Sequence, residues 1–422
     1  MQKKPFVSHE KLEEIAARFP TPFHLYDEQG IRETARALRK AFGWNAGFRE
    51  YYAVKACPNP FIMRVLIEEG CGMDCSSLTE LMLAEAVGLS GRDIMFSSNE
   101  TPAEDYEYAR RLNAIINLDD ITHIDFLARH GGIPEEICLR YNPGGEFRIG
   151  TEIMGEPSEA KYGMTRPQIF EAAARLRVMG VKRFGLHAFL ASNMADDNYY
   201  PANADVLFQL AADLRRELGV EISMVNLSGG IGIPYLPEES MPDIAHIGRL
   251  VEDRFNRSLG NPVFENCSVF AELGRFMTGP HGCLVTRAIH SKHIYRDYVG
   301  VDACAVDLMR PAMYGAYHHI TVSGKEDAPA DHIYDVVGGL CENNDKFAVR
   351  RLLPEIREGD LLVIHDTGAH GYSMGYNYNG KLRSAEILLH ADGSFSMIRR
   401  AETPRDYFAT FDFCDILNKI EG

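Results

Sequence analysis

Eight strand-like runs alternate with helical patterns between residues 51 and 273. The runs are rich in β-branched and aromatic residues, and they are Tyr51–Lys55, Gly72–Ser76, Ile94–Ser98, Ala114–Leu118, Ile137–Asn142, Phe184–Phe189, Ser223–Leu227 and Val269–Leu273. Helical periodicity lies between most of them, for example at 61–69, 78–86, 166–177, 204–218 and 247–257. Strand–helix units repeated eight times predict a closed parallel (β/α)8 barrel of the TIM type, because an open doubly wound sheet seldom needs eight in order.

After about residue 280 the alternation gives way to strands separated by turns. These strand-like segments are Cys283–Ile289, Tyr298–Val301, Tyr334–Gly338, Leu361–His365 and Ala385–Leu389. They predict a second, mostly antiparallel β domain of the sandwich or barrel kind, which the N-terminal strand at 22–26 is expected to join. The predicted division is therefore a barrel over 28–280 and a β domain made of 1–27 plus 281–422.

The net charge, the hydropathy and the cysteines of the chain restrict its expected partners, its compartment and its metal content. The formal net charge is −16 at pH 7, whereas nucleic acid and anionic membranes both require a basic face, so we expect neither as a partner. No apolar run reaches membrane-spanning length, and no signal-peptide pattern is visible at the N-terminus. Nine cysteines without CxxC pairs or metal-ligand spacing indicate reduced thiols in a cytoplasm and no metal site.

Lys55 is the first candidate catalytic residue. It closes the first predicted strand, and Pro58 and Pro60 prevent that strand from continuing. A desolvated lysine has a lowered pKa and can form a Schiff base with a carbonyl cofactor such as pyridoxal phosphate. The alternative is a lysine that extends to solvent at the strand mouth.

Two other strand ends indicate an anion site. In (β/α)8 barrels functional groups gather at the carboxyl ends of the strands, and phosphate is often bound after strands seven and eight. Here the seventh run leads into Ser228–Gly232 and the eighth into Glu272–Arg275. One glycine cluster alone more often marks a tight turn, but two at these positions suit a phosphate. A lysine, a carboxylate and a phosphate cradle at one opening suit pyridoxal phosphate.

Seven motifs in order resemble those of fold-type III pyridoxal-phosphate decarboxylases, which have an alanine-racemase-like barrel. The motifs are Tyr52–Lys55, Asp74–Ser77 with Glu80, Arg140–Pro143, Gly229–Gly232, Glu272–Arg275, Arg310–Tyr314 and Cys341–Asp345. The resemblance covers nearly the whole chain and looks most like the diaminopimelate decarboxylase branch. It implies a lyase of lysine biosynthesis that converts meso-diaminopimelate to L-lysine, in a homodimer with shared active sites.

The resemblance also implies roles for the cofactor-binding residues. Lys55 would carry the Schiff base, Glu272 would hold the pyridine nitrogen protonated, and Asp74 would support it. For Glu272 the alternative is an ion pair with Arg275 across the turn. The resemblance assigns the phosphate to Ser192, Gly230, Gly232, Gly274 and Arg275.

For the substrate, the resemblance implies residues from both predicted domains. Cys341 would lie near the reacting carbon of a neighbouring subunit's site as candidate proton donor, and Glu342 would face a substrate amine. Taken alone, such a cysteine is usually a small buried hydrophobe. The distal carboxylate of diaminopimelate would be held by Arg275, Arg310 and Tyr314, because a guanidinium group suits a carboxylate.

Two positions depart from the family pattern. The histidine that stacks on the cofactor ring is replaced by Phe189, which can stack but can neither hydrogen-bond nor titrate. The tyrosine of a Gly-Ala-Tyr motif that contacts the phosphate is replaced by His370, so that either His370 or Tyr372 would make this contact. These two differences from the family pattern do not change the expected cofactor. They weaken the expectation that the substrate is diaminopimelate.

Three other functions stay open at the level of the sequence. The first is decarboxylation of another basic amino acid, such as ornithine, arginine or a carboxylated polyamine. The second is an amino-acid racemase, but racemases of this fold typically place an arginine against the ring nitrogen, which Glu272 argues against. The third is a non-catalytic regulator of the antizyme-inhibitor kind, which the intact Lys55 and glycine turns disfavour.

Overall fold

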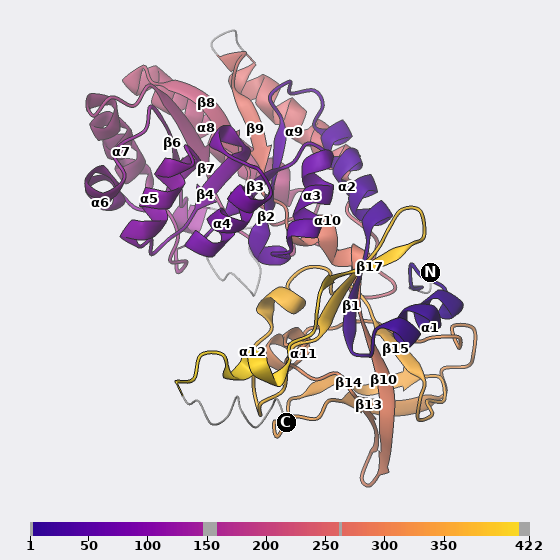
Figure 1. Cartoon of the computed structure of the whole chain (residues 1–422). Helices are drawn as coiled ribbons and strands as arrows, with labels where there is room; N and C mark the ends of the chain where they lie inside the picture. Colours follow the sequence, from indigo (N-terminus) through magenta and orange to yellow (C-terminus); the bar gives the residue numbers. More distant parts are fainter. Residues whose placement is uncertain (1–2, 147–157, 261–263, 413–422) are drawn as a thin grey trace. The chain divides into compact units, whose positions relative to one another are not determined.

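The chain forms two compact units in the computed structural model (Figure 1). The described residues are 3–146, 158–260 and 264–412. Ile31–Ile233 and Met241–Met277 make up the barrel unit, and the described parts of Met1–Gly30, Pro234–Ser240 and Thr278–Gly422 make up the β unit. Pro234–Ser240 falls inside the range expected for the barrel, yet it packs with the β unit.

The barrel unit is built on a closed parallel barrel of eight strands. The strands are β2 (Arg49–Ala53), β3 (Gly72–Cys75), β4 (Ile94–Ser97), β5 (Ile115–Leu118), β6 (Glu136–Arg140), β7 (Arg183–His187), β8 (Glu221–Asn226) and β9 (Ser268–Ala271). They pair in chain order, and β9 closes the barrel by pairing with β2. The predicted (β/α)8 barrel is confirmed, and its closure brings the first and last strands side by side.

A helix follows each barrel strand, and α2 precedes the first. The helices are α2 (Glu28–Ala41), α3 (Pro60–Glu68), α4 (Leu78–Ala86), α5 (Ala103–Arg111), α6 (His123–His130), α7 (Arg166–Val178), α8 (Tyr199–Leu218), α9 (Ile244–Leu259) and α10 (Arg275–Thr278). Side-chain caps begin several of them: Asn59 accepts from the N–H of Phe61, and Ser77 accepts from the N–H of Glu80. Local sequence therefore sets where these helices start.

Large side chains fill the barrel interior in a layer to which most of the strands contribute. The layer contains Tyr51, Met95, Ile115, Cys138, Met224 and Phe270, all buried. Two glycines make room for it: a Cβ on Gly72 would lie 2.7 Å from Cδ1 of Tyr51, and one on Gly185 would lie 2.6 Å from Cγ of Met224. The interior is packed like a core, so that space for a ligand remains at the strand ends.

The β unit contains a sheet of nine strands. They are β1 (Phe23–Asp27), β10 (Gly282–His293), β11 (Asp297–Val301), β12 (Ile320–Val322), β13 (His332–Val337), β14 (Lys346–Leu353), β15 (Leu361–Ile364), β16 (Ala385–Leu389) and β17 (Phe395–Arg399). The N-terminal strand β1 pairs antiparallel with β10 and parallel with β16. The sequence patterns did not predict β12, β14 and β17, because β12 is very short and the other two lack clear apolar alternation.

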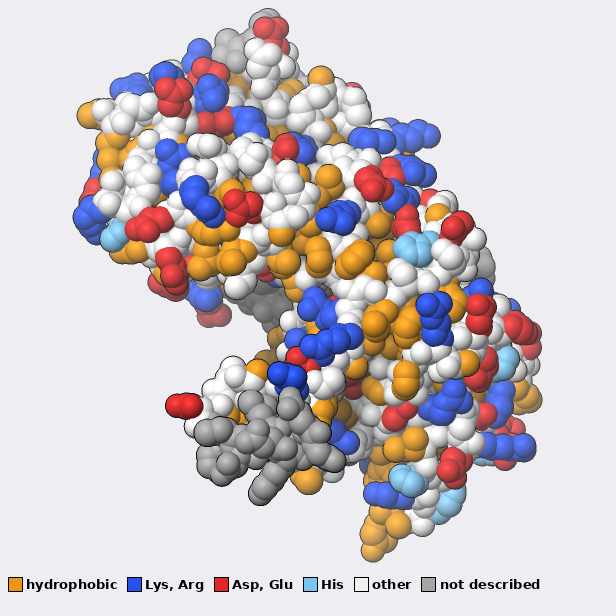
Figure 2. Space-filling view, in the orientation of Figure 1, with side chains coloured by type: hydrophobic (Ala, Val, Ile, Leu, Met, Phe, Trp, Pro, Cys, Tyr) orange, Lys and Arg blue, Asp and Glu red, His pale blue; other side chains and the backbone are white. Residues whose placement is uncertain are grey.

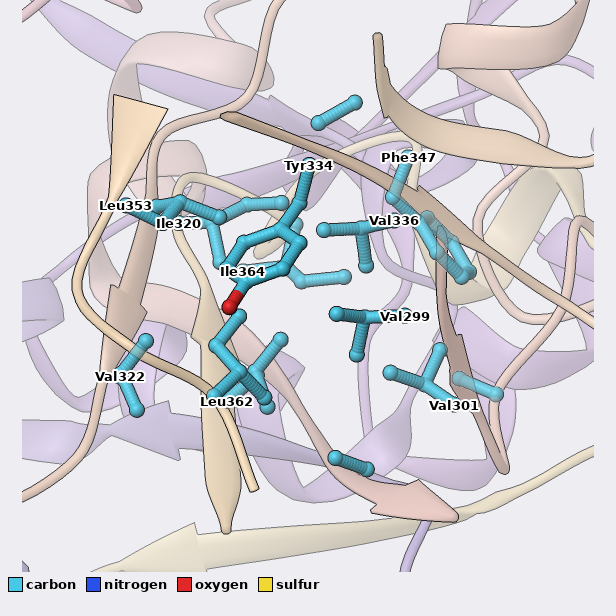
Figure 3. Close-up of a cluster of buried hydrophobic side chains, with 14 of the residues drawn as sticks. Val299, Val301, Ile320, Val322, Tyr334, Val336, Phe347, Leu353, Leu362 and Ile364 are labelled. Atoms are coloured by element: carbon cyan, nitrogen blue, oxygen red, sulfur yellow. The ribbon is translucent and has the colours of Figure 1, made fainter. Parts of the chain in front are cut away.

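Two hydrophobic clusters stabilise the β unit. Figure 3 shows one, in which side chains such as Val299, Tyr334 and Ile364 from different strands point toward one another. In the other, Leu12 and Ile15 of α1 (His9–Arg18) pack with side chains of the sheet. The single-turn helix α11 (Arg310–Tyr314) and the one-turn 3₁₀ helix η6 (Tyr372–Met374) lie in connections between strands, and the single-turn helix α12 (Pro404–Phe408) follows the last strand.

Charged side chains of both signs are interspersed on the face that Figure 2 shows. Within the described ranges no helix has the length and apolar character that crossing a membrane requires. Over the same residues, no group of three His, Cys, Asp or Glu side chains has the arrangement that would hold a metal ion.

Candidate active site

Lys55 lies at the mouth of the barrel, just beyond the first strand. β2 ends at Ala53, and Val54–Ala56 form a 3₁₀ turn, η1, that carries Lys55. The side chain is 50% exposed, and its Nζ lies 3.8 Å from Oδ2 of Asp74 and 5.7 Å from the ring centroid of Phe189. The predicted strand-terminal, desolvated lysine is therefore wrong in detail, because the turn lifts the amine out of the packed strand and leaves it half exposed.

A cavity of about 240 Å³ opens at the carboxyl ends of the barrel strands. Its charged and aromatic lining consists of Lys55, Asp74, Arg140, Lys161, Tyr162, His187, Phe189 and Glu272. Four of these, Lys55, Asp74, Phe189 and Glu272, are residues that the sequence predicted for a cofactor site. They come from positions far apart in the chain, and closure of the barrel brings them to one opening.

Glu272 is buried at this cavity and accepts hydrogen bonds from four side chains. The donors are His187 Nε2 (2.9 Å) and Ser228 Oγ (3.1 Å) to Oε2, and Asn226 Nδ2 (2.7 Å) and Ser97 Oγ (3.4 Å) to Oε1. Burial by itself raises the pKa of Glu272, but its interactions with His187, Lys55 and Asn226 outweigh burial and hold that pKa below its usual value. Glu272 is therefore ionised at neutral pH.

Two other carboxyl groups lie buried near Glu272. Burial, followed by repulsion from Glu272, raises the pKa of Asp74 well above its ordinary value. Burial also raises the pKa of Glu50, and Glu272 adds to the rise. The distance of 3.8 Å from Asp74 to Lys55 would permit an ion pair, and Lys55 lowers the pKa of Asp74. Burial and Glu272 raise that pKa by more, so that of the three carboxyl groups Glu272, with its four donors, is the one whose ionised form the site favours.

His187, the last residue of β7, is a site residue that the sequence reasoning missed. Its Nε2 contacts Glu272, and its Nδ1 is buried without a hydrogen-bond partner among the described residues. Burial lowers the pKa of His187 and outweighs the attraction of Glu272, so that the ring is neutral and donates from Nε2. The sequence did contain a signal for His187. It lies two residues before Phe189, and alternate residues of a strand share one face, so that both side chains are expected on the same side.

The loops after β7 and β8 are joined by backbone hydrogen bonds. The N–H of Met194 donates to the carbonyl of Gly230 (2.8 Å), and the N–H of Gly232 donates to the carbonyl of Met194 (2.7 Å). This pairing brings the segment that carries Ser192 beside Gly230 and Gly232, as a shared phosphate site would need. The amide of Gly232 is engaged within the protein, so that Gly232 shapes the turn and is not itself a donor for an anion.

Glycine is required at three positions of these turns. Gly230 has φ of 114°, and a Cβ there would lie 2.5 Å from the ring of Tyr199. A Cβ on Gly232 would lie 2.8 Å from the backbone of Asn193, and one on Gly274 would lie 2.7 Å from Cβ of Ala56. The backbone is therefore closely packed where the chain turns, which is typical of anion cradles.

Six other predicted residues belong to the β unit, whereas Arg275 begins α10 in the barrel unit. The six are Arg310, Tyr314, Cys341, Glu342, His370 and Tyr372. Arg310 is buried, and its Nη1 donates to the hydroxyl of Tyr235 (2.9 Å) and to Nε2 of His318 (3.0 Å). Tyr314 follows one turn later on α11 and is 52% exposed.

Cys341 is exposed, whereas the seven other cysteines in the described residues are buried. The neighbouring Glu342 is exposed as well. The alternative of a small buried hydrophobe is therefore wrong for Cys341, and its thiol is accessible to another molecule.

His370 and Tyr372, the two candidates for the missing phosphate contact, differ in their surroundings. His370 has left-handed backbone with φ of 56°. Tyr372 is buried, and the guanidinium carbons of Arg383 and Arg399 lie 3.8 and 4.8 Å from its ring centroid. Two arginines therefore hold the ring of Tyr372, whereas His370 is only partly buried.

Known proteins are similar to this chain along most of its length. A family model described as pyridoxal-dependent decarboxylase, pyridoxal binding domain, matches residues 28–279. Protein TabA of Pseudomonas amygdali pv. tabaci is 40% identical over 398 residues, which cover 94% of this chain and 92% of TabA. Diaminopimelate decarboxylase of Methanothermobacter thermautotrophicus is 34% identical over 397 residues, which cover 93% and 92%. The crystal structure of diaminopimelate decarboxylase from M. jannaschii with L-lysine has a TM-score of 0.85 at 28% identity, covering 95% and 94%.

Proposed function

Because this chain belongs to the family of pyridoxal-dependent decarboxylases, we propose that it converts meso-diaminopimelate to L-lysine. Curated diaminopimelate decarboxylases match it over nearly their whole length. The name of TabA states no substrate, so that the choice of diaminopimelate depends on those relatives and on the chemistry of Arg310.

The residues around the cavity fit pyridoxal phosphate, the cofactor of the family. This cofactor needs an amine for its aldehyde, a carboxylate for its ring nitrogen, a surface for its ring and an anion site for its phosphate. Lys55, the ionised Glu272 and Phe189 would meet the first three needs. The turns that carry Ser192 and Gly230 would hold the phosphate, together with the turn at Gly274.

When bound, pyridoxal phosphate supplies an electron sink for the electron pair that a departing carboxylate leaves behind. Lys55 would hold the cofactor covalently through Nζ until the substrate amine takes its place. Glu272 would keep a proton on the ring nitrogen, because its own charge is fixed by four donors. Phe189 would pack against the ring without exchanging protons with it.

Arg310 carries the argument for diaminopimelate. Two of its hydrogen-bond partners are neutral groups, since Tyr235 offers a hydroxyl group and His318 must be neutral to accept at Nε2. These bonds orient the buried guanidinium. The distal end of diaminopimelate carries a carboxylate that a guanidinium group can bind through paired hydrogen bonds, whereas the distal ends of ornithine and lysine carry no carboxylate. Arg275 and Tyr314 would assist in this contact.

A decarboxylation assay over a panel of amino acids tests the substrate. We expect diaminopimelate to release carbon dioxide fastest, ahead of ornithine, arginine, lysine and carboxylated polyamines, with the Lys55→Ala protein as the blank. If ornithine or arginine is fastest, the substrate assignment fails while the decarboxylase assignment stands. A protein that binds no pyridoxal phosphate would favour a regulatory function.

We further propose a cytoplasmic homodimer in which Cys341 and Glu342 complete the site of the other subunit. The eight cysteines in the described residues are free thiols, as expected in a reducing compartment. Cys341 is exposed, as a residue offered to a second subunit must be. It would deliver the proton to the reacting carbon after carbon dioxide leaves.

Mixing two inactive variants should restore activity if the sites are shared. Heterodimers of Lys55→Ala and Cys341→Ala subunits carry one site with both native residues. Random mixing should recover about a quarter of wild-type activity, since half of the dimers would have one intact site of two. The measurement is carbon dioxide release after subunit exchange, with mass-resolved proof that heterodimers formed. No recovery in that sample would mean that Cys341 acts within its own chain or not at all.

A further inference from the structure

We propose that His187 is a positioning residue that keeps the negative charge of the active site on Glu272 and thereby holds the cofactor's ring nitrogen in its protonated form. The inference rests on the proposed contact between Glu272 and that nitrogen. It goes further in naming one of the four donors whose removal should change the state of Glu272.

The geometry of His187 makes it a neutral donor. The side chain is 1% exposed, and Nε2 lies 2.9 Å from Oε2 of Glu272. Its Nδ1 is buried with no hydrogen-bond partner in the described part of the chain. A proton on Nδ1 would therefore be an unpaired buried donor, which costs free energy, so that the single ring proton resides on Nε2.

A neutral donor affects Glu272 differently from a cation. A cationic partner would neutralise the carboxylate and compete with any positive group brought by a ligand. The hydrogen bond from His187 stabilises the ionised form but leaves its charge available. Glu272 can therefore bind a protonated ring nitrogen. The positive charge of that nitrogen would offset the negative charge of the buried carboxylate.

Competing carboxyl groups explain why this donor matters. Glu50 accepts one bond, from the N–H of Leu273 at 2.7 Å, and its other oxygen has no partner among the described residues. Oδ1 of Asp74 likewise lacks a partner in the described residues. Three carboxyl groups so close in a buried site cannot all ionise, and the best hydrogen-bonded one keeps the charge. Loss of the His187 donor should shift the balance toward protonated Glu272.

Titratable groups approach Glu272 from several elements that pack around it. They are Glu50 on β2, Lys55 on η1, Asp74 on β3, Cys138 on β6, His187 on β7 and Tyr200 on α8. Arg140 on β6 interacts with Asp74 and His187 in the same site. Arg140 is paired with Asp119 at 3.1 Å. Within this set, His187 is the group whose hydrogen bond to Glu272 the described residues show.

The test compares three substitutions of one residue. His187→Gln keeps a neutral N–H donor at about the position of Nε2, His187→Asn is one carbon too short to reach, and His187→Leu removes the donor. The measurement is the dissociation constant of pyridoxal phosphate from the apoprotein as the pH is lowered from neutrality toward the pKa of Glu272, which is about 2 in the wild-type protein, for as long as the apoprotein stays folded. Thermal unfolding of each apoprotein shows that the variants are folded.

We expect His187→Leu and His187→Asn to bind pyridoxal phosphate roughly 10–100-fold more weakly at pH 7, the usual effect of losing a hydrogen bond to a charged group. His187→Gln should stay within several-fold of wild type. Binding that needs ionised Glu272 is present above its pKa and is lost as the pH falls through it. Because removal of a donor raises that pKa, the acid loss of binding should begin about one pH unit or more higher in the Leu and Asn variants.

Two outcomes would overturn the inference. In one, all three variants follow the wild-type pH profile, so that His187 only fills space. In the other, His187→Gln is as impaired as His187→Leu, so that the donor is not what matters. Failure of the proposed function looks different, because wild-type protein would then bind no pyridoxal phosphate at any pH.

Discussion

Lys55→Ala should lower the rate of decarboxylation by on the order of 10⁴-fold or more, because it removes the amine that holds the cofactor and is regenerated in every turnover. Lys55 is the lysine beside Asp74 and Phe189 at the cavity mouth. The measurement is carbon dioxide release, paired with borohydride reduction and peptide mass analysis. Reduction of wild-type protein should fix the cofactor to Lys55, and reduction of the variant should fix none.

Lys161 provides the matched control, since its side chain lines the same cavity. Lys161→Ala should still be labelled at Lys55. Lys55→Arg preserves the positive charge but cannot form the covalent bond, so that it should be as inactive as Lys55→Ala. A label at Lys161 in the wild-type protein, or an active Lys55→Arg, would contradict the assignment.

Arg310→Met should reduce kcat/KM for diaminopimelate by on the order of 2–4 kcal/mol of transition-state stabilisation, the usual cost of removing one partner of a buried charge pair. The guanidinium that Tyr235 and His318 orient would be lost, and the distal carboxylate would enter the pocket unpaired. The measurement is the steady-state rate with diaminopimelate and, in parallel, with ornithine, which has no such carboxylate. The rate with ornithine should fall far less.

The controls separate charge, shape and cofactor binding. Arg310→Lys keeps the charge without the planar fork, and it should give an intermediate rate. The affinity for pyridoxal phosphate should remain near wild type in both variants, since the proposed phosphate turns lie in the barrel unit. A wild-type preference for ornithine, or an Arg310→Met protein with unchanged kcat/KM, would mean that the departures at Phe189 and His370 accompany a different substrate.

The barrel could be predicted from the sequence because its signals are local. Apolar runs of strand length and the glycines after the seventh and eighth runs each act over a few positions. The β unit was harder to predict, since β14 and β17 lie at the two ends of the strand order and lack the clear apolar alternation of the inner strands. The exposure of Lys55 differs from the sequence prediction because a single 3₁₀ turn decides whether this residue ends the strand or follows it.

The sequence by itself determined the family and the order of the strands, and it named Lys55, Glu272 and the glycine turns as candidate site residues. Only the tertiary structure decided which carboxyl group carries the charge. The donors to Glu272 come from Ser97, His187, Asn226 and Ser228, which barrel closure gathers around one side chain. Ionisation depends on burial and on the directions of neighbouring dipoles. These are properties of the folded arrangement that no local pattern along the chain contains.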